Sequence, residues 1–214
     1  MRFATVLLLA LAILTLGGAP VHAAPPAGSS QVFIAFTGGS MWTSATTGTC
    51  VWYFPILGNM PLSSLFASDA SAAPVIDKEH AYFIWVSDWS IQAMFSNPGF
   101  GGSNVALAVV PAGTATIYYS SNPASRDWSD VTKRGTWGMP VAKFVRGAGL
   151  FQSPDNFTVS DKFYFSAPLI ASKTFTFGSR QFDFRELMPH GITCFEYGQQ
   201  YSTTETGSCL SMGN

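Results

Sequence analysis

Charged residues are scarce in this 214-residue chain: aspartate, glutamate, lysine and arginine make up 11% of it, and the formal net charge is −1. Nucleic-acid binding needs clustered lysine and arginine side chains that neutralise phosphates, and the sequence has no such cluster. It also lacks a polybasic run and a long amphipathic helical pattern. We therefore expect no nucleic-acid partner and no binding to a membrane surface.

Long apolar runs are missing except at the start, where residues 4–16 are apolar and too short for a comfortable membrane span. Arg2 precedes this run, and Val21-His22-Ala23 carries small residues at the positions that a signal peptidase recognises. The pattern predicts a signal peptide over 1–23, a flexible leader over 24–30 and a single domain over 31–214. Without Arg2 the mature chain has ten basic and twelve acidic residues, a formal charge of −2. We expect it to be secreted or periplasmic, with no membrane span.

Motifs for cofactors, metals and nucleophilic catalysis are absent as well. The sequence has no Gly-x-Ser-x-Gly elbow, no phosphate-binding glycine loop, no dinucleotide fingerprint, and neither His-Glu-x-x-His nor Cys-x-x-Cys. Beyond residue 23 there are two histidines, His80 and His190, both in segments typical of loops. The sequence therefore predicts no cofactor and no metal site.

Cysteine is rare, with three residues, and an exported chain favours pairing of two of them. Three pairings are possible, and Cys194 with Cys209 is the most local. The segment between them is polar and contains glycine, and its closure by a disulfide contributes on the order of 3 kcal/mol in the chain-entropy model. We predict a Cys194–Cys209 disulfide and a buried, reduced Cys50 in an apolar strand.

Aromatic residues, in contrast, are abundant at 14% of the chain. Between Phe163 and Phe177 they recur with period two, which is typical of a strand with one buried face. Gly178-Ser179 follows as a two-residue hairpin loop that places Phe175 opposite Phe182. Pro168 cannot donate to a ladder, so we expect the long arm to bend there or to lie at an edge. The hairpin predicts these core residues: Phe163, Phe165, Phe175, Phe182 and Phe184.

Other extended segments punctuated by glycine and proline complete the pattern. One long strand is expected over 81–95, a second hairpin around 111–114, and one short helix around 62–66. Nine or ten short, mostly antiparallel strands favour an all-β single domain, either a β-barrel or a β-sandwich.

One long polar connection, residues 120–138, concentrates charge and carries two tryptophans. Loops of this length tend to be functional, so Arg126, Asp127 and Trp128 are candidate ligand-binding residues. The alternative is that this segment is a structural cap over an open end of the fold.

A further candidate is Asp88, which interrupts an apolar strand between Trp85 and Trp89. Its carboxylate either points to solvent or lies in a cavity with a raised pKa. Glycosidase chemistry needs two carboxylates that are distant in sequence. The available candidates are Asp88, Asp127, Asp130 and Glu196.

The function expected from these features is passive: an exported binding or accessory protein for a small apolar or carbohydrate-like ligand, held against aromatic side chains. Two alternatives are a small secreted β-barrel enzyme (a hydrolase, lyase or cyclase) and a structural or interaction protein that pairs through a strand edge. Titratable groups that converge in a pocket would favour the enzyme. An exposed apolar patch would favour the interaction protein.

Overall fold

The computed structural model describes residues 32–68, 73–98, 104–153, 160–199 and 204–212. The predicted signal peptide and leader lie outside these ranges. The described part of the chain is built almost entirely of antiparallel strands, joined by turns and by four short 3₁₀ helices. None of its helices is long and apolar enough to cross a membrane.

The strands are β1 (Phe33–Ser44), β2 (Thr47–Leu57), β3 (Phe83–Ser90), β4 (Ala93–Pro98), β5 (Asn104–Val110), β6 (Gly113–Tyr119), β7 (Met139–Arg146), β8 (Gly149–Ser153), β9 (Ser160–Ala167), β10 (Leu169–Ser172), β11 (Phe175–Phe177), β12 (Arg180–Phe182), β13 (Ile192–Gln199) and β14 (Thr204–Ser211). The 3₁₀ helices are η1 (Leu62–Ser64), η2 (Pro123–Ser125), η3 (Arg134–Thr136) and η4 (Phe184–Glu186). The short helix expected around 62–66 is present as η1.

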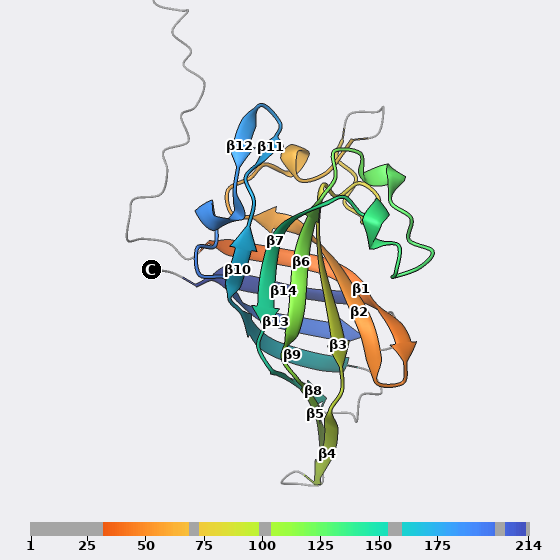
Figure 1. The fold of residues 1–214 in the computed structure, drawn as a ribbon. Helices are drawn as coiled ribbons and strands as arrows, with labels where there is room; N and C mark the ends of the chain where they lie inside the picture. Colours follow the sequence, from red (N-terminus) through yellow and green to blue (C-terminus); the bar gives the residue numbers. More distant parts are fainter. Residues whose placement is uncertain (1–31, 69–72, 99–103, 154–159, 200–203, 213–214) are drawn as a thin grey trace, which may run out of the picture. The chain divides into compact units, whose positions relative to one another are not determined.

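Twelve strands form one sheet in the order β10-β7-β6-β3-β2-β1-β14-β13-β9-β8-β5-β4, and β11 and β12 form a small second sheet. The large sheet curls into a half-barrel (Figure 1). The all-β prediction is confirmed. The described residues contain fourteen strands instead of nine or ten, because bends divide several of the long extended segments.

The first of two bent ribbons spans residues 83–119. On one side of the bend β3 pairs with β6, and on the other side β4 pairs with β5. Both arms bend at the same level, at 91–92 and 111–112, where Pro111 has no N–H to donate to a ladder. The expected single strand over 81–95 is therefore two strands. The expected hairpin turn around 111–114 is wrong, because this segment is the bend at which β5 continues into β6.

The second bent ribbon spans residues 139–172. Here β7 pairs with β10 and β8 pairs with β9, and the bends lie at 147–148 and at Pro168. The predicted bend at Pro168 is confirmed. The corner is tight: the Gly147 N–H donates to the Ser166 carbonyl oxygen at 2.7 Å, and a Cβ on Gly149 would lie 2.2 Å from the Phe163 ring.

Each ribbon bends, so the strand pair on one side of its bend lies toward one end of the strand order and the pair on the other side lies toward the opposite end. β10, β7, β6 and β3 form one layer of the curl, which crosses in front of β1, β14, β13 and β9, and β8, β5 and β4 lie at the lower end (Figure 1). Side chains meet across the interior. The Trp85 and Phe165 ring centroids are 6.4 Å apart, and the Arg146 guanidinium lies 5.7 Å from the centre of the Phe163 ring.

Large aromatic side chains fill the concave face of the sheet. Trp52 and Trp85 are directly opposed on β2 and β3, stack with 6.0 Å between ring centroids, and are both buried. Phe144 of β7 packs against Trp85 at 4.9 Å. Such rings bury large areas and dominate the stability of a core.

The predicted hairpin register is confirmed: Phe175 pairs with Phe182, and Phe177 pairs with Arg180. All of the core residues predicted from this region are buried: Phe163, Phe165, Phe175, Phe182 and Phe184.

The predicted disulfide is also confirmed. Cys194 of β13 and Cys209 of β14 are directly opposed in the ladder, with Cα atoms 4.1 Å apart, and their sulfur atoms are bonded. Cys50 is a free, buried thiol. Burial raises its pKa well above the usual value, which makes it a poor nucleophile.

Replacing Phe175 by alanine is expected to lower the free energy of unfolding by about 3–5 kcal/mol, because the ring is 4% exposed and its loss leaves a cavity. Phe33, which is 47% exposed on β1, provides the matched control. Its alanine variant should cost less than about 1 kcal/mol. Urea denaturation measures both, and equal costs would show that the hairpin does not form part of the core.

Candidate functional site

A pocket of about 390 Å³ lies at the bend of the first ribbon. This volume is within the range of small-molecule sites, about 300–1,000 Å³. Its walls come from the β1–β2 turn, the end of β3, the bend at 111–113, the long connection and the end of β7. The lining residues are Thr43, Thr47, Gly48, Thr49, Asp88, Trp89, Ser90, Pro111, Ala112, Gly113, Val131, Arg134 and Arg146.

One wall is a hydrogen-bonded group of Asp88, Thr49 and Arg134. Thr49 and Asp88 are opposed on β2 and β3, and the Thr49 hydroxyl donates to Asp88 Oδ1 at 2.6 Å. Arg134, at the start of η3, donates from Nη1 to Asp88 Oδ2 at 2.9 Å and from Nη2 to Oδ1. This two-pronged geometry is the strong form of an arginine–carboxylate pair.

The Asp88 carboxyl is held in its ionised form. Partial burial raises its pKa, but the hydrogen bonds from Arg134 and Thr49, together with the charge of Arg134, outweigh this effect. The net result is a pKa below the ordinary value. The raised pKa considered for Asp88 as a cavity residue is therefore not found.

Trp89 follows Asp88 on β3, so its side chain points to the opposite face of the strand. Its indole N–H donates to the Ser40 hydroxyl at 3.3 Å, and the Trp42 ring packs against it edge-on at 4.5 Å. The indole lies against the backbone of β2 at Gly48, where a Cβ would be 2.6 Å from Trp89 Cζ2. Glycine at this position is what allows the ring to lie so close to the strand.

Arg146 contributes to the pocket from the last position of β7. It is 3% exposed and donates to the Ser87 hydroxyl at 3.4 Å, the Gly147 carbonyl at 3.3 Å and the Pro111 carbonyl at 3.0 Å. These bonds connect the corner of one ribbon to the corner of the other. Burial lowers the pKa of Arg146, while Cys50 and Glu196 in the interior act in the opposite direction.

Among the residues proposed from the sequence, Asp88 lines this pocket and Arg126 does not. Arg126 is buried, and its guanidinium donates to the carbonyl oxygens of Trp137 at 2.9 Å, Tyr82 at 3.1 Å and Ala81. Burial lowers its pKa to about 10. These contacts fasten the long connection to the chain entering β3.

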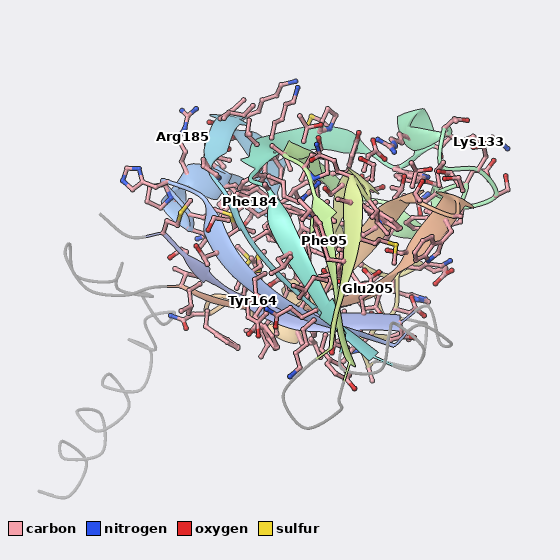
Figure 2. All side chains as sticks on the ribbon, turned by 90° about the horizontal axis from the view of Figure 1, so that it is seen from below. Phe95, Lys133, Tyr164, Phe184, Arg185 and Glu205 are labelled. Carbon is pink, nitrogen blue, oxygen red and sulfur yellow. A yellow bond between two sulfur atoms is a disulfide. The ribbon has the colours of Figure 1, made fainter. Side chains whose placement is uncertain are left out.

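Asp127 and Trp128 also lie outside the pocket walls. Asp127 accepts a hydrogen bond from Lys133 at 2.6 Å, and Lys133 points away from the sheet (Figure 2). The Trp128 ring packs against Trp137 at 5.2 Å. A role in ligand binding for these residues stays a prediction.

The long connection itself packs on the outer face of the sheet. Val86 and Ile84 point to this face of β3 and are buried, and Trp137 contacts Tyr118 of β6 edge-on at 6.5 Å. The connection reaches the pocket only through Val131 and Arg134.

Arg134 and Arg146 were not identified from the sequence. Arg146 had a detectable signal: it follows Ala142 and Phe144 at alternate positions of one strand, so it lies on the apolar face, where a charge is unusual. Arg134 had none, because its meeting with Asp88 joins residues 46 positions apart.

Comparison of the chain with models of known protein families, with curated proteins and with solved structures finds no match. Within the described residues, no three His, Cys, Asp or Glu side chains gather closely enough to hold a metal ion. An all-β fold by itself does not indicate a function. The chemistry of the pocket is therefore the basis for inferring one.

Replacing Gly48 by alanine is expected to displace the Trp89 indole and to destabilise the protein by about 1–3 kcal/mol, the usual cost of overpacking. Gly135, next to Arg134, has open space around its Cβ position and provides the control. Its alanine variant should stay within about 0.5 kcal/mol of the wild type. Thermal unfolding and tryptophan fluorescence measure both effects, and an unchanged Gly48→Ala spectrum would contradict the close contact.

The Asp88–Arg134 pair predicts a pH dependence. Because the folded-state pKa of Asp88 is lowered, the pair stabilises the protein above the ordinary aspartate pKa, about 3.9, and this contribution is lost as the pH falls through the lower folded value. The Asp88 side chain is 58% exposed, so the contribution is about 1 kcal/mol or less. The stability gap between wild type and Asp88→Asn should close between pH 5 and about pH 2. A gap that stays constant over this range would contradict the assignment.

Proposed function

We propose that the protein is an exported binding protein whose pocket holds a small, sugar-like ligand. The observation that carries the proposal is the combination of the Trp89 indole with the Asp88–Arg134 pair on the walls of one pocket. Sugars present an apolar ring face and hydroxyl edges. In the proposed complex the indole packs on the apolar face of the ligand, while the charged pair exchanges hydrogen bonds with its hydroxyls.

The hydroxyls of the pocket support the same ligand class. Thr43, Thr47 and Ser90 line it together with Thr49. The Thr47 hydroxyl is held by hydrogen bonds with Thr43 at 2.8 Å and Ser44 at 2.7 Å. A hydroxyl donates one hydrogen bond and accepts two, so this wall can serve either role toward a polyhydroxylated ligand.

Binding is favoured over catalysis by the titratable groups of the pocket. Asp88 is the one carboxylate among its lining residues, which include no histidine or cysteine. A general acid needs a proton at working pH, whereas Arg134 keeps Asp88 ionised. Of the other acidic candidates, Asp127 and Asp130 lie on the outer connection and Glu196 is buried, so none lines the pocket with Asp88.

Export is part of the proposal. The Cys194–Cys209 disulfide suits an oxidising compartment, such as the periplasm or the cell exterior. A carbohydrate-binding protein outside the cytoplasm meets its ligand directly, without a transport step.

The test is titration of neutral sugars, including glucose, galactose and their disaccharides, by calorimetry and by saturation-transfer NMR. Wild type is expected to bind at least one of them saturably. Asp88→Asn should weaken binding about tenfold or more, which corresponds to about 1.4 kcal/mol. Asp130→Asn, an exposed aspartate outside the pocket, is the control and should bind like wild type. No saturable binding to any sugar at millimolar concentration would refute the proposal.

A further inference from the structure

We infer that the preferred ligand of this pocket is an acidic sugar, whose anionic group is bound by Arg146. This inference rests on the proposed function and specifies its ligand class. It starts from the charges that line the pocket. Asp88 and Arg134 neutralise each other through a two-pronged ion pair, which leaves the guanidinium of Arg146 as the remaining charge among the lining residues.

The hydrogen bonds that Arg146 makes to described residues do not use all of its N–H donors. A guanidinium has five N–H donors, and three bonds to described residues engage Nε, Nη1 and Nη2 once each. All three acceptors are neutral oxygens: a hydroxyl and two carbonyls. Within the described ranges, no acceptor is bonded to the second N–H of either terminal nitrogen. Two such donors are the set with which arginine binds carboxylate or phosphate oxygens.

Gly113 is the pocket residue that lies directly against Nη2 of the buried Arg146. A Cβ on Gly113 would lie 3.0 Å from Nη2, so a side chain at this position would press on the guanidinium. Gly113 and Pro111 both line the pocket, and the bond from Nη2 to the Pro111 carbonyl fixes the guanidinium at this wall.

Glu196 influences the same guanidinium electrostatically. It is 3% exposed, belongs to β13 in the interior and is not part of the pocket lining. Burial lowers the pKa of Arg146, and the Glu196 carboxylate acts in the opposite direction. A buried cation near a pocket is stabilised by an anion that excludes water from it, which gives an acidic ligand an advantage over a neutral one.

The experiment compares glucuronate with its methyl ester, which has nearly the same shape and no charge, and includes glucose 6-phosphate as a second anion. Wild type is expected to bind glucuronate at least tenfold more tightly than the ester, with an advantage that shrinks as the salt concentration rises. Tighter binding of the phosphate than of glucuronate would identify phosphate as the anionic group. The acid–ester comparison needs no variant, so it does not depend on whether a substituted Arg146 folds.

Variants then assign the effect to Arg146. Arg146→Gln should abolish the difference between acid and ester, and Arg146→Lys should retain part of it. Gly113→Ala, which crowds Nη2, should reduce it while Arg146 keeps its charge. Lys143→Gln, an exposed charge on the same strand, is the control and should leave it unchanged.

The outcomes separate this inference from the proposed function. Equal binding of glucuronate and its ester, with neutral sugars also bound, would overturn the acidic preference and leave sugar binding intact. An acid preference that survives in Arg146→Gln would overturn the role of Arg146. Absence of binding to every sugar, charged or neutral, would overturn both.

Discussion

The bending of two long antiparallel ribbons is the constraint on which the rest of the structure depends. A flat twelve-stranded sheet would expose its aromatic face, whereas two ribbons that bend at the same level fold that face onto itself. Pro111 and Pro168 interrupt the ladder hydrogen bonds at the bends, and Gly149 permits close approach of the Phe163 ring. The core of stacked tryptophans and phenylalanines forms because these corners bring β3 and β7 over β9.

The pocket is a consequence of the same bends. Where β3 ends and the chain turns toward β4, its pairing with β6 stops at Ser87, while β2 still pairs with β3 as far as Ser90. Asp88, Trp89 and the 111–113 bend meet there. Arg146 connects this corner to that of the second ribbon through Pro111 and Gly147, so the residue proposed to bind an anion also stabilises the bend. Preorganisation of this kind lowers the entropic cost of binding.

Different residues of the long connection, 120–138, have different roles. Arg126 and Trp137 fasten it to the outer face of the sheet by buried hydrogen bonds and ring contacts, and Arg134 alone extends a charge to the pocket. This attachment of the long connection is made within the protein, because Arg126 donates its hydrogen bonds to backbone carbonyl oxygens. A charged side chain in a long loop therefore does not by itself identify a ligand-binding residue. The deciding property is whether the protein already satisfies its hydrogen bonds.

The sequence by itself determined the class of the fold, the register of the Phe175–Phe182 hairpin, the bend at Pro168 and the Cys194–Cys209 bond. These features depend on residues close in sequence, on period-two burial and on proline's missing N–H. Tertiary structure decided which strands pair on each side of the bends. The alternation of buried and exposed side chains is the same before and after a bend, so it does not identify the partner strand. It also decided that Arg134 meets Asp88 and that Arg146 reaches the pocket. Those contacts join distant residues, and their partners depend on how the ribbons fold over one another.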